Sequence, residues 1–559
     1  MGVRTLKGGA GASWALGAAG LACLSALSAC SGDDEHAGPT KTEPALTFGD
    51  CPSDLPGSTQ GRQCAVTQVP LRWDEPDGKT IELLVARYRS STPNKGQLWM
   101  LDGGPGGTGA VYMLDQVLPL YASLGLDVYV PQHRGTGHST PLDCDAKEDL
   151  HACGEELLGV WGDGLQGFHS VEAAHDVGHL IERSRPSGAP VFVFGLSYGS
   201  YWAQRYMQAF PAQAEGVILE GVFPLYQPLW EGDVPSDAAA RSLFVPCREN
   251  SDCAAAFGSE DPEDATRAVL AQADDASARC LGDDGADRIT LEGVFSLLIV
   301  GEGAQFVPGL VRRLRRCSAQ DQKELVAFAY FIASAASAEV DPAIDNGVLG
   351  SHVLRTDLMA SLTTFPLAER LAAREPLLFW SGAAPTEEFD AVVEAWPVNY
   401  PPASTELPAS LPPVLMLNGG LDIQTPSVWA EGLAPKLGAT LVEFPYAGHG
   451  VDISLSSPVT ANDASCSLGM LQSFVDDPHA AIDGSCAATA YTPDVAGTTE
   501  VSQYLASAIY GDGATLLGDD GSAPQPRRIY PQSRNETLAA AETAFRQRLA
   551  RAARDLRGY

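Results

Sequence analysis

The feature that most constrains the fold is a pentapeptide, Gly195-Leu196-Ser197-Tyr198-Gly199, that separates two regular patterns. Residues 191–194 before it alternate valine with phenylalanine, which predicts a buried strand. Residues 198–210 after it have helical spacing. A serine between a strand and a helix is typical of a tight, strained turn that holds the hydroxyl above the edge of a sheet. An ordinary glycine and serine turn is the alternative, and both flanks argue against it.

Similar short apolar or alternating runs recur along the chain, and turn residues bound them. Helical patterns lie between several of these runs, for example at residues 171–183. Strands that alternate with helices predict a mostly parallel sheet covered by helices on both faces. The predicted strands are residues 81–88, 97–101, 126–130, 190–195, 216–220, 413–418 and 440–444.

The alternation stops after about residue 222 and resumes near residue 411. The stretch between them is rich in alanine, leucine and arginine at helical spacing, so we expect an inserted helical domain. A last helix is expected to carry Leu538, Phe545, Leu549 and Leu556, either docked on the acidic body or facing an anionic surface. The predicted organisation is a first core part at 46–224, a helical cap at 225–410, a second core part at 411–490, and a polar tail with a terminal helix at 491–559.

The first thirty residues are typical of an export signal, with Arg4 and Lys7 followed by an apolar run and small residues. Leu27-Ser28-Ala29-Cys30 resembles the lipobox of bacterial lipoproteins, in which the cysteine becomes the lipidated first residue. Residues 31–45 would then form a flexible tether. Simple cleavage nearby, with Cys30 free, is the alternative.

Ten cysteines remain after Cys23 in the signal and Cys30 at the anchor are set aside. Five disulfides between sequence neighbours, formed in an oxidising compartment, are the simplest hypothesis. Metal binding is the competing reading, and it lacks support because the chain has no Cys-x-x-Cys pair. The expected pairs are Cys51 with Cys64, Cys144 with Cys153, Cys247 with Cys253, Cys280 with Cys317, and Cys466 with Cys486.

The formal net charge is −34 at pH 7. Such a charge repels phosphate backbones and anionic lipid headgroups. We therefore expect no nucleic-acid partner, and membrane contact only through the N-terminal lipid anchor.

A serine hydroxyl is a poor nucleophile until a base takes its proton, so a carboxylate and a histidine should follow Ser197 in that order. Asp422 comes directly after the predicted strand 413–418, and His449 comes after the predicted strand 440–444. Both positions lie beyond the carboxyl end of a strand, where open α/β sheets keep their active sites. The alternatives fit less well, because His133 and His138 precede the serine and Glu443 lies inside a strand.

The oxyanion of an acyl-transfer intermediate needs backbone N–H donors. The run Gly103-Gly104-Pro105-Gly106-Gly107 follows a predicted strand, and backbone without side chains can approach a substrate closely. We assign one donor to Gly104 and the second to Tyr198. A plain glycine-rich turn is the alternative, and a phosphate-binding loop would need a Lys-Ser or Lys-Thr ending that is missing.

Five ordered motifs together resemble the prolyl aminopeptidase and tripeptidyl aminopeptidase family, over roughly residues 45–490. The resemblance implies the α/β-hydrolase fold and a serine exopeptidase that releases proline, a dipeptide or a tripeptide from a free peptide N-terminus beneath a helical lid. The motifs are Gly103-Gly104-Pro105-Gly106, Arg134-Gly135-Thr136-Gly137, the Gly-Leu-Ser-Tyr-Gly turn, Gly420-Leu421-Asp422 with Thr425-Pro426, and Gly448-His449-Gly450.

The family also binds the α-ammonium group of its substrate through acidic residues of the lid. Glu231 and Glu302 are candidates for this role by chemistry, and solvated surface glutamates are the alternative reading. One departure stands out, because Asp102 occupies the position where prolyl aminopeptidases usually carry a histidine.

These residues predict acyl transfer without a metal or an organic cofactor. An ester or small-amide hydrolase of the same fold is the main alternative, because the triad does not select the acyl group. A catalytically silent surface binding protein is the other class. Such proteins generally lose a triad member, and all three members are present here.

Overall fold

The computed structural model describes residues 44–57, 60–92, 94–113, 117–147, 149–336, 346–359, 369, 372, 377–379, 396–398, 400–452, 465–518 and 532–557. The predicted signal, Cys30 and residues 31–43 of the predicted tether lie outside this set. Within it, no helix combines the length and the apolar character that crossing a bilayer would need. The residues from Ala45 onward form one compact unit.

An eight-stranded sheet forms the centre of this unit, in the order β1-β2-β4-β3-β5-β6-β7-β8. Strand β2 runs antiparallel to both of its neighbours, and all other adjacent pairs are parallel. This strand order is that of the α/β-hydrolase fold, so the predicted fold class is confirmed. The strands are β1 (Arg62–Pro70), β2 (Thr80–Tyr88), β3 (Gly96–Leu101), β4 (Leu126–Pro131), β5 (Val191–Leu196), β6 (Gly216–Glu220), β7 (Val414–Gly419) and β8 (Thr440–Phe444).

Both faces of the sheet are buried, which explains the apolar runs in the sequence. In β5, Val191 and Val193 pack into one core cluster, whereas Phe192 and Phe194 pack into a cluster on the opposite face. The first cluster is covered by α2 (Leu150–Trp161), α3 (Ser170–Ser184), α4 (Tyr198–Ala209) and α15 (Ser427–Leu437). The second is covered by α1 (Val117–Ala122) and α17 (Ser465–Asp476).

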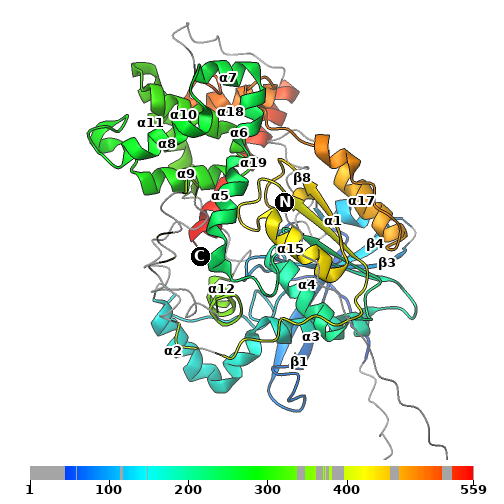
Figure 1. The fold of residues 1–559 in the computed structure, drawn as a ribbon. Helices are drawn as coiled ribbons and strands as arrows, with labels where there is room; N and C mark the ends of the chain where they lie inside the picture. Colours follow the sequence, from blue (N-terminus) through cyan, green and yellow to red (C-terminus); the bar gives the residue numbers. More distant parts are fainter. Residues whose placement is uncertain are drawn as a thin grey trace, which may run out of the picture. The chain divides into compact units, whose positions relative to one another are not determined.

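The stretch between β6 and β7 supplies most of a separate group of helices with its own apolar core (Figure 1). Two C-terminal helices, α18 (Glu500–Tyr510) and α19 (Gln532–Arg557), pack into the same core against α11. We call α5 to α11 with α18 and α19 the helical group. Its inserted members are α5 (Asp233–Arg241), α6 (Phe244–Glu249), α7 (Ser251–Phe257), α8 (Pro262–Ala273), α9 (Arg288–Val300), α10 (Val307–Arg316) and α11 (Ala319–Ala336).

The C-terminal segment differs from the expected polar tail. The predicted terminal helix is present as α19, with Leu538, Phe545 and Leu549 fully buried. Helix α18 was not predicted, although its Leu505 and Ile509 are buried as deeply. The apolar residues of this segment do follow helical spacing, so a local signal was present, at Val501, Tyr504, Leu505, Ala508 and Ile509. A local pattern does not indicate that the helix packs on an insertion nearly 200 residues earlier.

All five predicted disulfides are present. Each closes a short loop, from 6 residues between Cys247 and Cys253 to 37 residues between Cys280 and Cys317. Among the described residues, no group of histidine, cysteine and acidic side chains is arranged to hold a metal ion.

Candidate active site

Ser197 lies at the sharp turn between β5 and α4. Its φ of 60° is in the left-handed region, which a residue with a side chain adopts only where the surroundings enforce it. The two glycines of the turn allow the backbones to touch. A Cβ on Gly195 would lie 2.2 Å from the carbonyl oxygen of Gly199, and a Cβ on Gly199 would lie 2.1 Å from that of Leu101.

Asp422 lies in the loop after β7 and is completely buried. Its Oδ1 accepts the backbone N–H groups of Gln424 and Thr425 at 3.0 and 2.9 Å, and its Oδ2 accepts the Thr425 hydroxyl at 2.7 Å. These donors satisfy a carboxylate in a site without water contact, and they fix its direction.

His449 lies in the loop after β8, and its side chain is 15% exposed. Its Nδ1 is 2.9 Å from Oδ2 and 3.0 Å from Oδ1 of Asp422. Because a carboxylate only accepts hydrogen bonds, Nδ1 carries the proton and donates it to Asp422. This hydrogen bond sets both the tautomer and the orientation of the imidazole.

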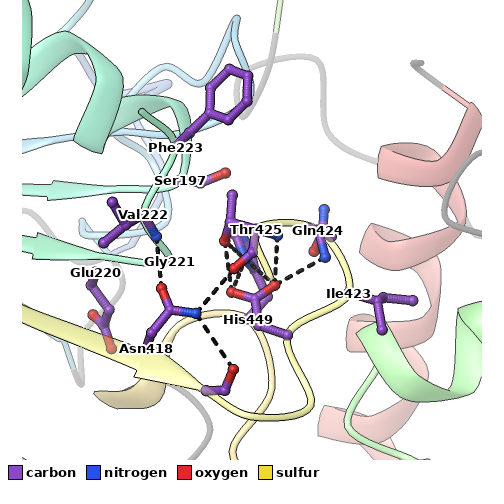
Figure 2. A network of polar contacts seen from close by, with 12 residues as sticks. Ser197, Glu220, Gly221, Val222, Phe223, Asn418, Ile423, Gln424, Thr425 and His449 are labelled. Atoms are coloured by element: carbon purple, nitrogen blue, oxygen red, sulfur yellow. Dashed lines mark hydrogen bonds and ion pairs between the residues drawn. The ribbon is translucent and has the colours of Figure 1, made fainter. Parts of the chain in front are cut away.

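The turns that carry Ser197 and His449 meet at the carboxyl edge of the sheet (Figure 2). The N–H of Ser197 donates to the carbonyl of Glu220 at 3.0 Å. The next residue, Gly221, touches the imidazole so closely that a Cβ there would lie 3.0 Å from Cε1 of His449. The structure therefore brings the three residues of the predicted triad to one place.

The predicted oxyanion loop also reaches this place. A Cβ on Gly103 would lie 3.0 Å from the Cβ of Ser197, so the loop backbone runs directly against the serine. Asp102 holds the loop, because its Oδ1 accepts the N–H of Gly103 at 2.8 Å and its Oδ2 accepts that of Gly109 at 2.7 Å. Gly104 has a φ of 110°, a conformation that glycine adopts without strain. Asp102 thus shapes the loop through these two hydrogen bonds.

Tyr198, the other predicted oxyanion donor, is the first residue of α4. Its hydroxyl lies 3.1 Å from Nε2 of His133, while Nδ1 of that histidine is 2.7 Å from the carbonyl of Arg134. Burial lowers the pKa of His133 to about 3, so the ring is neutral at physiological pH. His133 thus supports Tyr198 through a contact between two buried side chains.

The segment after β6 contacts the site at two loops. The N–H of Asn346 donates to the carbonyl of Gly106 at 2.9 Å, beside α12 (Gly347–Val353). At the acid loop, Leu421 and Ile423 flank Asp422 and insert their side chains into the core of the helical group. Ser236 of α5 donates its hydroxyl to the carbonyl of Ile423 at 2.6 Å. The acid loop is therefore anchored in both the sheet and the helical group.

The two glutamates predicted to bind substrate amines have partners outside the triad and its loops. Glu231 is exposed at the end of a short helical turn, Leu229–Glu231, and accepts the Gln227 amide at 2.9 Å. Glu302 is buried and forms an ion pair with Arg548 of α19. Neither carboxylate belongs to the contacts around Ser197 given above.

Three polar residues near the site escaped the sequence reasoning. Glu220 and Asn418 stand at the ends of buried apolar strands, and a polar residue that ends such a strand is a usable signal. Asn418 accepts the N–H of Val222 at 2.9 Å and donates to the carbonyl of Thr425 at 3.0 Å. Asp357, in the π-helix Leu354–Leu358, accepts the N–H of Ser170 at 2.9 Å. Burial raises the pKa of the Tyr198 hydroxyl well above its usual range, and the charge of Asp357 raises it further.

Comparison with known proteins gives matches to parts of the chain. A family model described as "TAP-like protein" matches residues 387–479, the stretch that contains Asp422 and His449. Carboxylesterase B of Mycobacterium tuberculosis H37Rv is 35% identical over 96 residues, which are 16% of this chain and 18% of that protein. The matched part thus spans less than a fifth of the length of this curated relative.

Two esterases of known structure are also similar to the chain. The enzyme from Thermogutta terrifontis is 13% identical, with 74% of this chain and 99% of that chain covered and a TM-score of 0.30. The enzyme from Rhodococcus sp. ECU1013 is 15% identical, with 71% and 95% covered and a TM-score of 0.30. The fold assignment itself rests on the strand order of the sheet.

Proposed function

We propose that this protein is a serine hydrolase of the α/β-hydrolase type, with Ser197 as nucleophile, His449 as general base and Asp422 as the orienting acid. One observation carries the proposal. A buried carboxylate holds Nδ1 of a histidine at 2.9 and 3.0 Å, and that histidine shares the sheet edge with a serine held at a φ of 60°. A strained serine beside an oriented imidazole is the arrangement that acyl transfer requires.

The proposed reaction has two halves. Nε2 of His449 takes the proton of the Ser197 hydroxyl while Oγ attacks the carbonyl carbon, and the N–H groups of Gly104 and Tyr198 hold the resulting oxyanion. The imidazolium then gives its proton to the leaving group. Water, activated by His449, releases the acyl group from Ser197.

The first candidate substrate is a peptide with a free N-terminus, from which proline, a dipeptide or a tripeptide would be removed. The motif resemblance and the TAP-like match over the acid and base loops support it. Glu231 and Glu302 remain candidates for binding the α-ammonium group.

The second candidate is a carboxylic ester or small amide. The similarity to a protein named Carboxylesterase B favours it. The same triad would act, and only the groups that bind the acyl and leaving parts would differ.

A substrate panel separates the two candidates. We would compare kcat/KM for a tripeptide anilide with a free amine, for its N-acetylated form and for a short-chain ester, with Ser197→Ala as the inactive control. An aminopeptidase should prefer the free amine by roughly 10- to 100-fold, the worth of one charge-assisted hydrogen bond. Faster cleavage of the acetylated peptide than of the free amine would exclude the aminopeptidase. Cleavage of the ester without measurable cleavage of either peptide would support the esterase.

We also propose that the protein is exported and anchored by a lipid on Cys30. The five disulfides support an oxidising location. Fractionation of cells that express the full chain tests the anchor. Wild type should sediment with membranes and Cys30→Ser should not, whereas equal distribution of the two proteins would contradict lipidation.

A further inference from the structure

Glu220 is a fully buried acidic residue at the end of β6, directly beneath the site. Its backbone carbonyl accepts the N–H of Ser197 at 3.0 Å. Its side-chain Oε1 accepts the N–H of Asp452 at 2.7 Å, three residues beyond His449. One residue therefore holds the nucleophile turn through its backbone and the histidine turn through its side chain.

The two residues that follow extend this connection. Gly221 packs against the imidazole of His449, because a Cβ added to Gly221 would lie only 3.0 Å from Cε1 of that ring. The N–H of Val222 donates to Asn418, which in turn donates to the carbonyl of Thr425 in the acid loop. Residues 220–222 thus touch the loops of all three triad members (Figure 2).

We propose that Glu220 is a positioning residue for the reaction, because the reach of its side chain to Asp452 fixes the turn of His449 relative to Ser197. The proposal rests on the roles of Ser197 and His449 given under the proposed function. Acyl transfer depends on the separation of these two side chains, and small misplacements of reacting groups reduce rates strongly.

The surroundings of Glu220 favour its neutral form, in which the side chain supplies a hydrogen-bond acceptor to the N–H of Asp452. Burial raises its pKa well above the usual range, and the nearby Asp452 and Asp422 carboxyl groups raise it further. Asp452 is itself buried, with a raised pKa, and its Oδ2 accepts the hydroxyl of Tyr121 at 3.0 Å. A neutral Glu220 offers a carbonyl oxygen to the N–H of Asp452, and a glutamine of the same length offers the same acceptor.

Two substitutions separate the length of the Glu220 side chain from its ability to carry a titrating proton. Glu220→Gln keeps the length and the acceptor but loses the titrating proton, whereas Glu220→Asp keeps the acid and is shorter by one methylene. Glu215→Gln and Glu215→Asp are matched controls, because Glu215 is exposed just before the opposite end of β6. Each variant is reacted with a fluorophosphonate, and the rate constant is expressed per folded site from the final amount of adduct.

We expect Glu220→Asp to lower this rate constant roughly 10- to 100-fold. Glu220→Gln should stay within about threefold of wild type, because its acceptor still reaches Asp452. In hydrogen exchange, residues 445–452 should exchange faster in Glu220→Asp and at the wild-type rate in Glu220→Gln. Both Glu215 variants should match wild type in both measurements.

A rate constant for Glu220→Gln as low as that for Glu220→Asp would overturn the proposal. The titrating carboxyl group of Glu220, and not the length of its side chain, would then determine the rate. Unchanged rate and exchange in Glu220→Asp would overturn it as well. Should Glu220→Asp not fold, a tenfold or larger loss in folded Glu220→Gln decides against it, and a wild-type rate supports it. A wild type that is not phosphonylated defeats the proposed function, while the exchange measurement still decides whether Glu220 holds the turn.

Discussion

We call the sheet with the helices on its two faces the sheet region. The sheet region and the helical group each contain a completely buried arginine paired with a buried acid, and the two ion pairs connect different parts of the chain. In the sheet region, Arg134 donates to Asp176 through Nε at 2.6 Å and through a terminal nitrogen at 2.5 Å. In the helical group, Arg313 donates to Glu324 at 2.7 Å. Both arginines are 0% exposed, so each pair depends on full satisfaction of its hydrogen bonds.

The remaining donors of the two arginines show the difference. Arg134 binds the carbonyls of Leu71 and Gly167 and adjoins His133, which contacts Tyr198 at the site. Arg313 binds the carbonyl of Leu516 at 2.7 Å and so ties α10 to the C-terminal segment. The first pair supports loops around the proposed chemistry, whereas the second joins the insertion to the end of the chain. Similar buried ion pairs therefore stabilise loops near the proposed active site in the sheet region and helix packing in the helical group.

The largest effect on activity is expected from a substitution in the proposed triad, which belongs to the sheet region. Asp422→Asn should lower the rate of phosphonylation by about 10⁴-fold, because the amide no longer holds the required tautomer of His449. The melting temperature should change little, since the shape of the side chain is kept. A loss of less than tenfold would show that Asp422 does not orient the base.

Breaking the buried pairs tests whether their roles differ as described. Arg134→Met and Arg313→Met should each lower the free energy of unfolding by about 3–5 kcal/mol, because each leaves a buried carboxylate without its cation. Denaturant titration measures this loss, and phosphonylation of the folded fraction should be slower only in Arg134→Met. Arg315→Met is the control, since its half-exposed pair with Glu260 should be worth about 1 kcal/mol or less. Equal rates in both buried variants would remove the distinction between the regions.

Disulfides should contribute according to loop length, so the largest single contribution should come from the longest loop, which lies in the helical group. Removing the bridge between Cys280 and Cys317, 37 residues apart, should cost about 4 kcal/mol by loop entropy. Removing the bridge between Cys144 and Cys153, 9 residues apart beside the sheet, should cost about 3 kcal/mol. Double Cys→Ser variants compared by thermal unfolding check this order, and a reversed order would contradict it.

The smallest effect is a pH dependence that Glu220 gives to the stability of the sheet region. Because burial raises the pKa of Glu220 above the usual 4.5, the folded chain keeps a proton that the unfolded chain loses. Wild-type stability should therefore fall as pH rises from 4.5 toward the folded-state pKa, and Glu220→Gln lacks this loss. Denaturant midpoints at pH 5 and pH 8 should show the variant gaining on wild type at the higher pH. A constant difference would argue against a raised pKa.

The two regions also differ in how much of them the sequence predicts. Seven of the strands, the turn at Ser197 and the loops of Asp422 and His449 were predicted, because each depends on a local pattern and on its position after a strand. Edge strand β1 was not predicted, since polar and apolar residues mix along it. The packing of α18 and α19 on the insertion was not predicted either, because it joins segments far apart in the chain.

The same limit applies inside the site. The sequence places Glu220 at a strand end, but only the structure shows that its side chain turns toward Asp452. Likewise, the chemistry of Glu302 suggested a substrate amine, whereas its described partner is Arg548 of α19. A residue type and a strand end predict a reactive position, and the direction of the side chain decides what it contacts.

The central claim is that Ser197 is an activated nucleophile, and site mapping of a fluorophosphonate adduct tests it most directly. The full chain is incubated with the probe, digested, and analysed by mass spectrometry, with Ser197→Ala alongside. Wild type should carry one adduct per chain on Ser197, and the variant should carry none. An unlabelled wild type, or equal labelling of the variant, would contradict it.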